Sequence, residues 1–172
     1  HAFIMLPREL VTGALLSCAD LGIKCATILA DGYSEAGCEG QSYQAALSKT
    51  AQDLNIRLLG PNSIGIINPQ AGVALSANAM LELPGFTQGR TGVISQSGSL
   101  IGAILSHGEA RHIGYSKLIS VGNEADLSVG EIGNLLVEDN NTDVILLFLE
   151  TIRDHHSIAE FARKAHKAGK PV

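Results

Sequence analysis

Positions 95–99 are rich in serine and glycine and come directly after a short apolar run. Residues 93–94 (Val-Ile) are typical of a buried strand, and the apolar residues that follow the turn recur at helical spacing. The first amides of a helix lack partners and its dipole favours negative charge, so this turn predicts an anion site. Ser97 and Ser99 would add hydroxyl donors, and Gly98 would permit close approach. An ordinary turn and helix cap is the alternative interpretation.

Three further polar residues follow predicted strands or precede a predicted helix. Glu150 comes directly after six apolar residues, so its carboxylate should lie at a strand tip, where it could orient a histidine or hold a metal through water. The alternative is an ordinary strand-end acid, exposed or paired with Arg153. Asp126 is more simply a helix N-cap. Asn62 lies in a strong turn and could donate to a ligand or only brace the loop.

The histidines are poor candidates for nucleophiles or metal ligands, because none lies beside a serine or cysteine at a predicted strand tip. Those considered are His107, His112, His155, His156 and His166. The sequence contains neither a Gly-x-Gly-x-x-Gly run nor a Walker loop, and no metal site is predicted. It therefore carries no complete dinucleotide or P-loop nucleotide site.

The composition is that of a soluble α/β protein, with 45% apolar residues, 17% charged residues and 19 glycines among 172 residues. A net charge of −5 argues against a nucleic-acid surface. No apolar run approaches the roughly 18 residues of a membrane span. The three cysteines lack metal spacing, Cys18 and Cys25 are expected to be buried, and reduced thiols fit a cytoplasmic protein.

Apolar runs alternate with helical periodicity in the first part of the chain. Strands are expected at 3–6, 23–29 and 56–59, with helices at about 10–21 and 41–54. Strands joined by right-handed helical crossovers form a parallel sheet.

Residues 69–90 lack a sustained period and are interpreted as a linker with one short strand at 73–75. The alternation then restarts, with strands at 93–94, 116–121 and 144–149 and helices at 99–111, 128–138 and 156–168. The predicted fold is α/β, with two three-layer parallel-sheet units divided into 1–68, 69–90 and 91–172. Both ends fall in apparent strands, so a fragment of a longer protein is expected.

Ligands of such sheets bind outside the carboxyl ends of the strands. This rule selects the same Gly-, Pro- and Asn-rich positions that could do chemistry. They are Leu6-Pro7, Asp31-Gly32, 60–65, 95–99, 122–126 and Glu150.

Four motifs occur in order along nearly the whole chain. They are LLGPNSIG at 58–65 with Asn68-Pro69, GVISQSGS at 92–99, SVGNEAD at 120–126, and LFLE at 147–150 leading to KPV at 170–172. With these four motifs together, the chain resembles the acyl-CoA synthetases (NDP-forming), which are relatives of the succinyl-CoA synthetase α subunit.

The resemblance implies that residues 1–68 are the end of a Rossmann-like CoA-binding domain and that 91–172 begin a flavodoxin-like ligase domain. Such enzymes interconvert acyl-CoA, ADP and phosphate with the free acid, ATP and CoA through a phosphohistidine. The family's CoA phosphate loop would lie before residue 1, and its phosphorylated histidine after Val172. ADP or ATP with Mg²⁺, an ATP-grasp domain or β subunit, and a homo-oligomeric assembly are expected for the parent protein.

The resemblance also implies roles for particular residues. Ser97, Gly98 and Ser99 would cradle the phosphohistidine, and Glu150 would orient it. The CoA-binding positions would be Pro7, Asp31 and Gly32 along the pantetheine arm and Asn62 and Ser63 near the thiol.

Two other functions are considered. Some proteins of this architecture are fused to an acetyltransferase, where the ligase-like part is a non-catalytic, regulatory acyl-CoA-binding module. A loop of the Ser-His-Thr-Gly type after residue 172 would favour catalysis over sensing. A flavin or nicotinamide protein of similar topology is disfavoured by the missing Gly-rich fingerprint.

Overall fold

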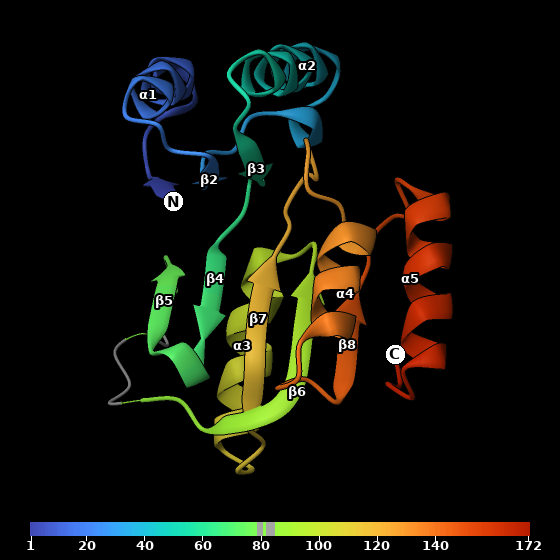
Figure 1. Ribbon diagram of the computed structural model, residues 1–172. Helices are drawn as coiled ribbons and strands as arrows, with labels where there is room; N and C mark the ends of the chain where they lie inside the picture. Colours follow the sequence, from blue (N-terminus) through green and yellow to red (C-terminus); the bar gives the residue numbers. More distant parts are fainter. Residues whose placement is uncertain (79–80, 82–84) are drawn as a thin grey trace.

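The computed structural model describes residues 1–78, 81 and 85–172 (Figure 1). Its first sheet is parallel, in the order β1 (Ala2–Ile4), β2 (Cys25–Ile28) and β3 (Arg57–Leu59). Helices α1 (Arg8–Asp20) and α2 (Cys38–Asp53) cover the same face, because both right-handed crossovers move the chain in one direction across the sheet. Among the described residues, no helix is both long and apolar enough to cross a membrane.

The second sheet has five strands in the order β5-β4-β7-β6-β8. β6 (Gln88–Ser95) pairs in parallel with β7 (Tyr115–Ser120) on one side and with β8 (Val144–Phe148) on the other. β4 (Gly65–Asn68) is antiparallel to β7, and β5 (Val73–Ser76) is antiparallel to β4. The expected parallel units are therefore present, and two antiparallel strands extend the second one.

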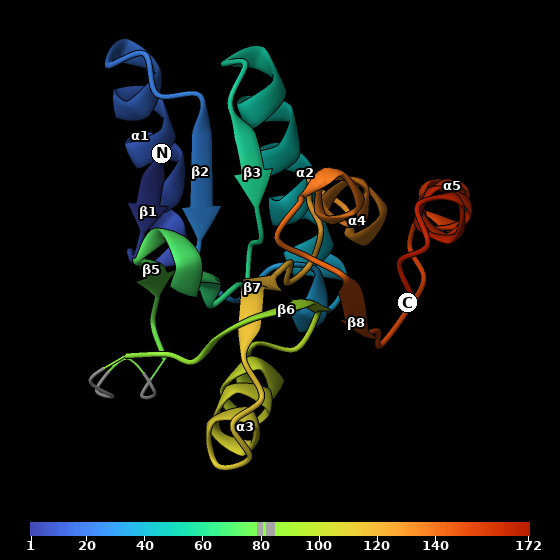
Figure 2. The same cartoon turned by 60° about the horizontal axis from the view of Figure 1, so that its bottom comes forward.

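Alternate residues of the central strands pack on opposite faces of this sheet. Val93 contacts the cluster that contains α3 (Gly98–Glu109), whereas Ile94 contacts the cluster of α4 (Val129–Glu138) and α5 (His155–Lys167). Figure 2 shows α3 below the sheet and α4 above it. β7, the next strand in the sequence after β6, lies on one side of β6 in the sheet, and β8 lies on the other side. The strand order therefore reverses at β6. A crevice is expected at such a reversal, between the carboxyl ends of β6 and β8.

Several sequence expectations need correction. The segment 69–90 was expected to be mainly a linker, but it contains β5 and the start of β6; its residues 79–80 and 82–84 lie outside the described residues. β4 was not predicted, and it pairs with the second sheet, although the division into domains at residue 68 itself stays a prediction. Cys18 is buried as expected, whereas Cys25 is exposed because it begins β2 at the sheet end.

The two units are joined by hydrogen bonds between residues 58–64 and 120–127. The amides of Leu127, Ala125 and Asn123 donate to the carbonyls of Leu58, Gly60 and Pro61 at 3.1, 2.9 and 2.9 Å. These bonds run along the carboxyl ends of β3 and β7, so the ligand-binding edges of both sheets face each other (Figure 1).

Phe161 of α5 is fully buried against Gly133 of α4, where an added Cβ would lie 2.6 Å from the ring. We expect Phe161→Ala to lower the free energy of unfolding by about 3–5 kcal/mol, measured by urea titration. Leu135→Ala, on the same helix as Gly133 but 60% exposed, is the control and should change it by less than about 1 kcal/mol. Equal effects of the two substitutions would contradict this packing.

Candidate functional site

A pocket of about 340 Å³ lies where the carboxyl ends of the two sheets meet. We call it the interface pocket. Six of the residues predicted from the sequence line it: Asn62, Ser63, Ser97, Gly98, Ser99 and Glu150. It is also lined by Leu29, Glu35, Ile64, Gln96, Gly122, Asn123 and Arg153. The structure thus brings together residues as far apart in the chain as Leu29 and Arg153, which are separated by 124 positions.

The N-terminus of α3 forms one wall of the interface pocket. The helix begins at Gly98, and the N-cap residue Ser97 makes no side-chain cap hydrogen bond, whereas α4 and α5 are capped by Ser128 and Asp154. The Ser97 hydroxyl instead lies 3.2 Å from that of Ser99. The first amides of α3 and two hydroxyls are therefore available to an anion.

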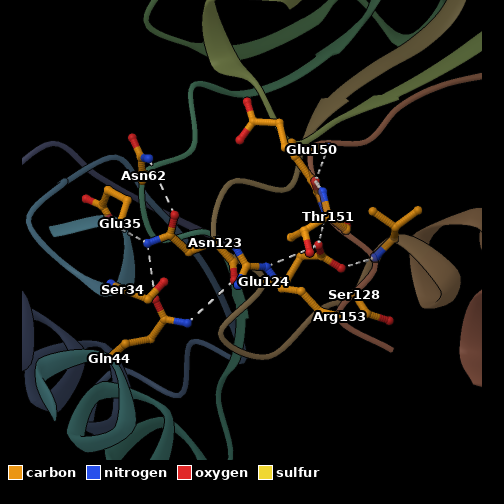
Figure 3. Close-up of polar contacts among 12 residues, drawn as sticks. Ser34, Glu35, Gln44, Asn62, Asn123, Glu124, Ser128, Glu150, Thr151 and Arg153 are labelled. Atoms are coloured by element: carbon orange, nitrogen blue, oxygen red, sulfur yellow. Dashed lines mark hydrogen bonds and ion pairs between the residues drawn. The ribbon is translucent and has the colours of Figure 1, made fainter. Parts of the chain in front are cut away.

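Glu150 also lines the pocket, directly after β8 and Leu149. Within the described part of the chain its carboxylate makes no hydrogen bond or ion pair, and Figure 3 draws it without a contact. The alternative of an ordinary strand-end acid holds in its exposed form. It does not hold as a pair with Arg153, whose guanidinium lies 3.8 Å from the carboxylate of Glu124. Glu150 is thus an exposed acid available to a ligand.

Asn62 and Ser63 brace the loop between the units. The Ser63 side chain is 1% exposed, and its hydroxyl donates to the carbonyl of Ser120 at 2.6 Å. Asn62 adopts a φ of 55°, and its side-chain nitrogen lies 3.4 Å from the side-chain oxygen of Asn123. The bracing interpretation of Asn62 fits these contacts, and a role of either residue near a thiol stays a prediction.

A polar cluster beside the pocket was missed by sequence reasoning. Asn123, 4% exposed, donates its side-chain amide to the carboxylate of Glu35 and, at 3.1 Å, to the side-chain oxygen of Gln44 (Figure 3). Glu35 also accepts from the backbone amides of Gly32 and Tyr33 at 2.5 and 3.1 Å. Asn123 falls in a segment that the strand-end rule selected, but no local signal marks Glu35 or Gln44.

The remaining predicted residues lie in a separate cleft of about 420 Å³ at the carboxyl ends of β1 and β2, which we call the first-sheet cleft. Pro7, Asp31 and Gly32 line it, together with Arg8. The Arg8 guanidinium donates to the carbonyl of Gly32 at 2.6 Å and lies 4.0 Å from the centre of the Tyr43 ring. This arginine ties α1 to the loop that carries Glu35.

Asp126 is not the cap of α4. Ser128 is, and it forms a capping box with Glu131. The Asp126 carboxylate instead accepts from the amide of Leu58 at 2.7 Å and from the Arg57 guanidinium at 2.9 Å. The expected cap was wrong because a partner far along the chain binds this acid.

The sequence of residues 88–172 matches the family described as succinyl-CoA ligase like flavodoxin domain. Over 99% of its length, the chain is 33% identical to acetate–CoA ligase [ADP-forming] I of Archaeoglobus fulgidus, of which it covers 24%. It is also 33% identical to acetate–CoA ligase [ADP-forming] II subunit alpha of Pyrococcus furiosus, covering 99% of this chain and 36% of that one.

Among solved structures, the chain is similar to dinucleotide forming acetyl-coenzyme A synthetase 1 of Ca. Korarchaeum cryptofilum, in complex with phosphate and ADP. The TM-score is 0.86 at 29% identity, covering 97% of this chain and 34% of that chain. The fold and its order of elements are therefore shared with that synthetase.

Residues 88–172 are thus a ligase-type flavodoxin domain, in which α5 packs against α4. Over 99% of its length the chain is similar to proteins named ADP-forming acetate–CoA ligases, which confirms its resemblance to the acyl-CoA synthetases (NDP-forming). It spans about a quarter to a third of the length of the relatives named above.

Burial alone would raise the pKa of Glu35, but hydrogen bonds from Asn123 and from the amides of Tyr33 and Gly32 outweigh it and hold the pKa below its ordinary value of 4.5. The ionised form is therefore favoured by folding. Its contribution to stability is present above pH 4.5 and is lost as the pH falls through the lowered pKa.

We expect the Glu35→Gln variant to lose this part of the acid sensitivity. Below pH 4.5, the free energy of unfolding of the variant should therefore decline less steeply than that of the wild type. Urea titrations at a series of pH values measure both free energies. Asn62→Gly, an uncharged change in the same pocket, should leave the pH dependence unaltered. Parallel curves for wild type and Glu35→Gln would contradict the role of these hydrogen bonds.

Proposed function

We propose that the complete protein is an acyl-CoA synthetase that interconverts acyl-CoA, ADP and phosphate with the free acid, ATP and CoA through a phosphohistidine. One observation carries the proposal. The uncapped N-terminus of α3, with the hydroxyls of Ser97 and Ser99, lines the same pocket as the carboxylate of Glu150, which has no hydrogen bond or ion pair among the described residues.

These groups suit the two halves of a phosphohistidine. The amides that begin α3 and the two serine hydroxyls would hold the phosphoryl oxygens, since a helix N-terminus favours negative charge. Glu150 would accept a hydrogen bond from the imidazole and fix its orientation. No histidine of this chain lines the interface pocket as the structure describes it, so the phosphorylated histidine would come from another part of the complete protein.

CoA would lie along the carboxyl edge of the first sheet, with its pantetheine arm in the first-sheet cleft. That cleft offers both apolar walls, from Leu6 and Pro7, and polar groups, from Asp31 and the Gly32 backbone. An extended chain of alternating methylene and amide groups fits such a mixed lining. CoA would supply the thiol that receives the acyl group.

The nucleotide would be bound elsewhere in the complete protein. We propose that ADP or ATP, with Mg²⁺, is held by an ATP-grasp domain or β subunit that docks near the interface pocket, in a cytoplasmic homo-oligomer. A subunit organisation is consistent with the name of the Pyrococcus furiosus relative, an alpha subunit.

A regulatory acyl-CoA-binding module is the weaker candidate. Several relatives carry the names of ADP-forming CoA ligases, from Archaeoglobus fulgidus, Methanocaldococcus jannaschii and Nitrosopumilus maritimus. A sensor also has no need for an anion-binding helix end in one pocket with an acid that has no partner in the described part of the chain.

We expect Ser97→Ala and Ser99→Ala, in the complete protein, to reduce phosphohistidine accumulation, because each lost bond to phosphate costs roughly 1.5–3 kcal/mol. Incorporation of radioactive phosphate from ATP measures the effect. Ser106→Ala, farther along α3 and outside the lining of the pocket, is the matched control. Unchanged labelling in both pocket variants would remove the anion-binding role.

A further inference from the structure

Gln96 lies at the end of β6 with only 6% of its surface exposed. Its backbone amide donates to the carbonyl of Phe148 at 3.1 Å, which continues the pairing with β8. Its side-chain oxygen accepts from the amides of Glu150 and Thr151 at 2.6 and 3.0 Å. Its side-chain nitrogen donates to the Thr151 carbonyl at 2.8 Å and to the Glu124 carboxylate at 2.5 Å. Both donors and both lone pairs of the amide are used.

Glu124 fixes the orientation of the Gln96 side-chain amide. Its side chain is 3% exposed, and its second oxygen accepts from the amide of Val129 at 2.8 Å, at the N-terminus of α4. A carboxylate only accepts hydrogen bonds, so Gln96 must turn its nitrogen toward Glu124. Its oxygen is then directed to the two amides that follow β8. The Arg153 guanidinium, 3.8 Å away, supplies a positive charge beside the Glu124 oxygen that accepts from Gln96 (Figure 3).

One residue thus links two parts of the lining of the interface pocket. The main chain of Gln96 leads directly into Ser97 and Gly98, at the start of α3. Its side chain holds the backbone of Glu150. The carboxylate of Glu150 has no hydrogen bond of its own among the described residues, so its position depends on how firmly this backbone is held.

We propose that Gln96, oriented by Glu124, is a positioning residue that holds the Glu150 carboxylate in the pocket that the N-terminus of α3 also lines. This inference rests on the proposed function, because the consequence it predicts is slower phosphoryl transfer. Neither Gln96 nor Glu124 needs to contact the transferred group. A displacement of about 1 Å at such a site can reduce a rate about 100-fold.

The test exchanges the two side chains in the complete protein. In Gln96→Glu, the nitrogen that donates to Glu124 is replaced by a carboxylate oxygen, and we expect the rate of phosphohistidine formation to fall about 10- to 100-fold. In the double variant Gln96→Glu, Glu124→Gln, the amide nitrogen at 124 can donate to the carboxylate at 96, and the amide oxygen can accept from Val129. The double variant should recover most of the lost rate. The bond to the Thr151 carbonyl and the ion pair between Arg153 and Glu124 are not restored.

The control is Gln41→Glu, the same chemical change at an exposed position of α2, which should keep the wild-type rate. Affinity for CoA should stay at the wild-type level in all variants, because the first-sheet cleft is separate. This split between an altered rate and an unaltered affinity distinguishes positioning from general loss of structure.

A Gln96→Glu variant with the wild-type rate, or a double variant no faster than Gln96→Glu, would overturn the role of Gln96. If Gln96→Glu fails to fold, hydrogen exchange of the backbone amides is measured in Glu124→Gln and in the wild type. We expect faster exchange at residues 150–151 in the variant, and equal exchange in the two proteins overturns the proposal. A wild-type protein that is never labelled would reject the proposed function itself, whereas equal labelling of wild type and Gln96→Glu rejects only this inference.

Discussion

The structure depends on one set of hydrogen bonds, those between residues 58–64 and 120–127. They pair successive backbone groups of two segments that belong to different sheets. Sliding one segment past the other would leave buried amides unpaired, at about 1–3 kcal/mol each. Gly122, with a φ of 56°, permits the contact, because a Cβ there would lie 2.2 Å from the Pro61 carbonyl oxygen. The interface pocket exists only because these two segments hold the carboxyl ends of the two sheets against each other.

Two consecutive residues extend this junction in opposite directions. Asn123 contacts Glu35 and Gln44 of the first unit, whereas Glu124 contacts Gln96 and the first turn of α4. A single turn after β7 therefore links the loop beside the first-sheet cleft to the tip of β8. Any change in how the two units dock therefore affects the lining of the interface pocket on both units.

Periodicity was sufficient to predict the three parallel strands of each unit and the helices between them, because each buries a regular apolar face. The strand-end rule then selected the segments that line the two cavities. β4 was missed because Gly65–Asn68 is short and follows a turn, and its strand character comes from pairing with β7. Glu35 could not be found either, since its partner Asn123 lies 88 positions away and no local pattern encodes that contact.

The lining of the interface pocket includes the carboxylates of both Glu35 and Glu150. These two acids oppose the attraction of the helix end for a free phosphate dianion, whereas Arg153, which also lines the pocket, adds to it. In the proposed mechanism, a phosphoryl group carried on a loop of the same protein would be presented at an effective concentration of roughly millimolar for a short flexible tether. Weak retention would then be sufficient for occupancy. It would also let the carrier leave quickly, which suits a group that must travel between two sites.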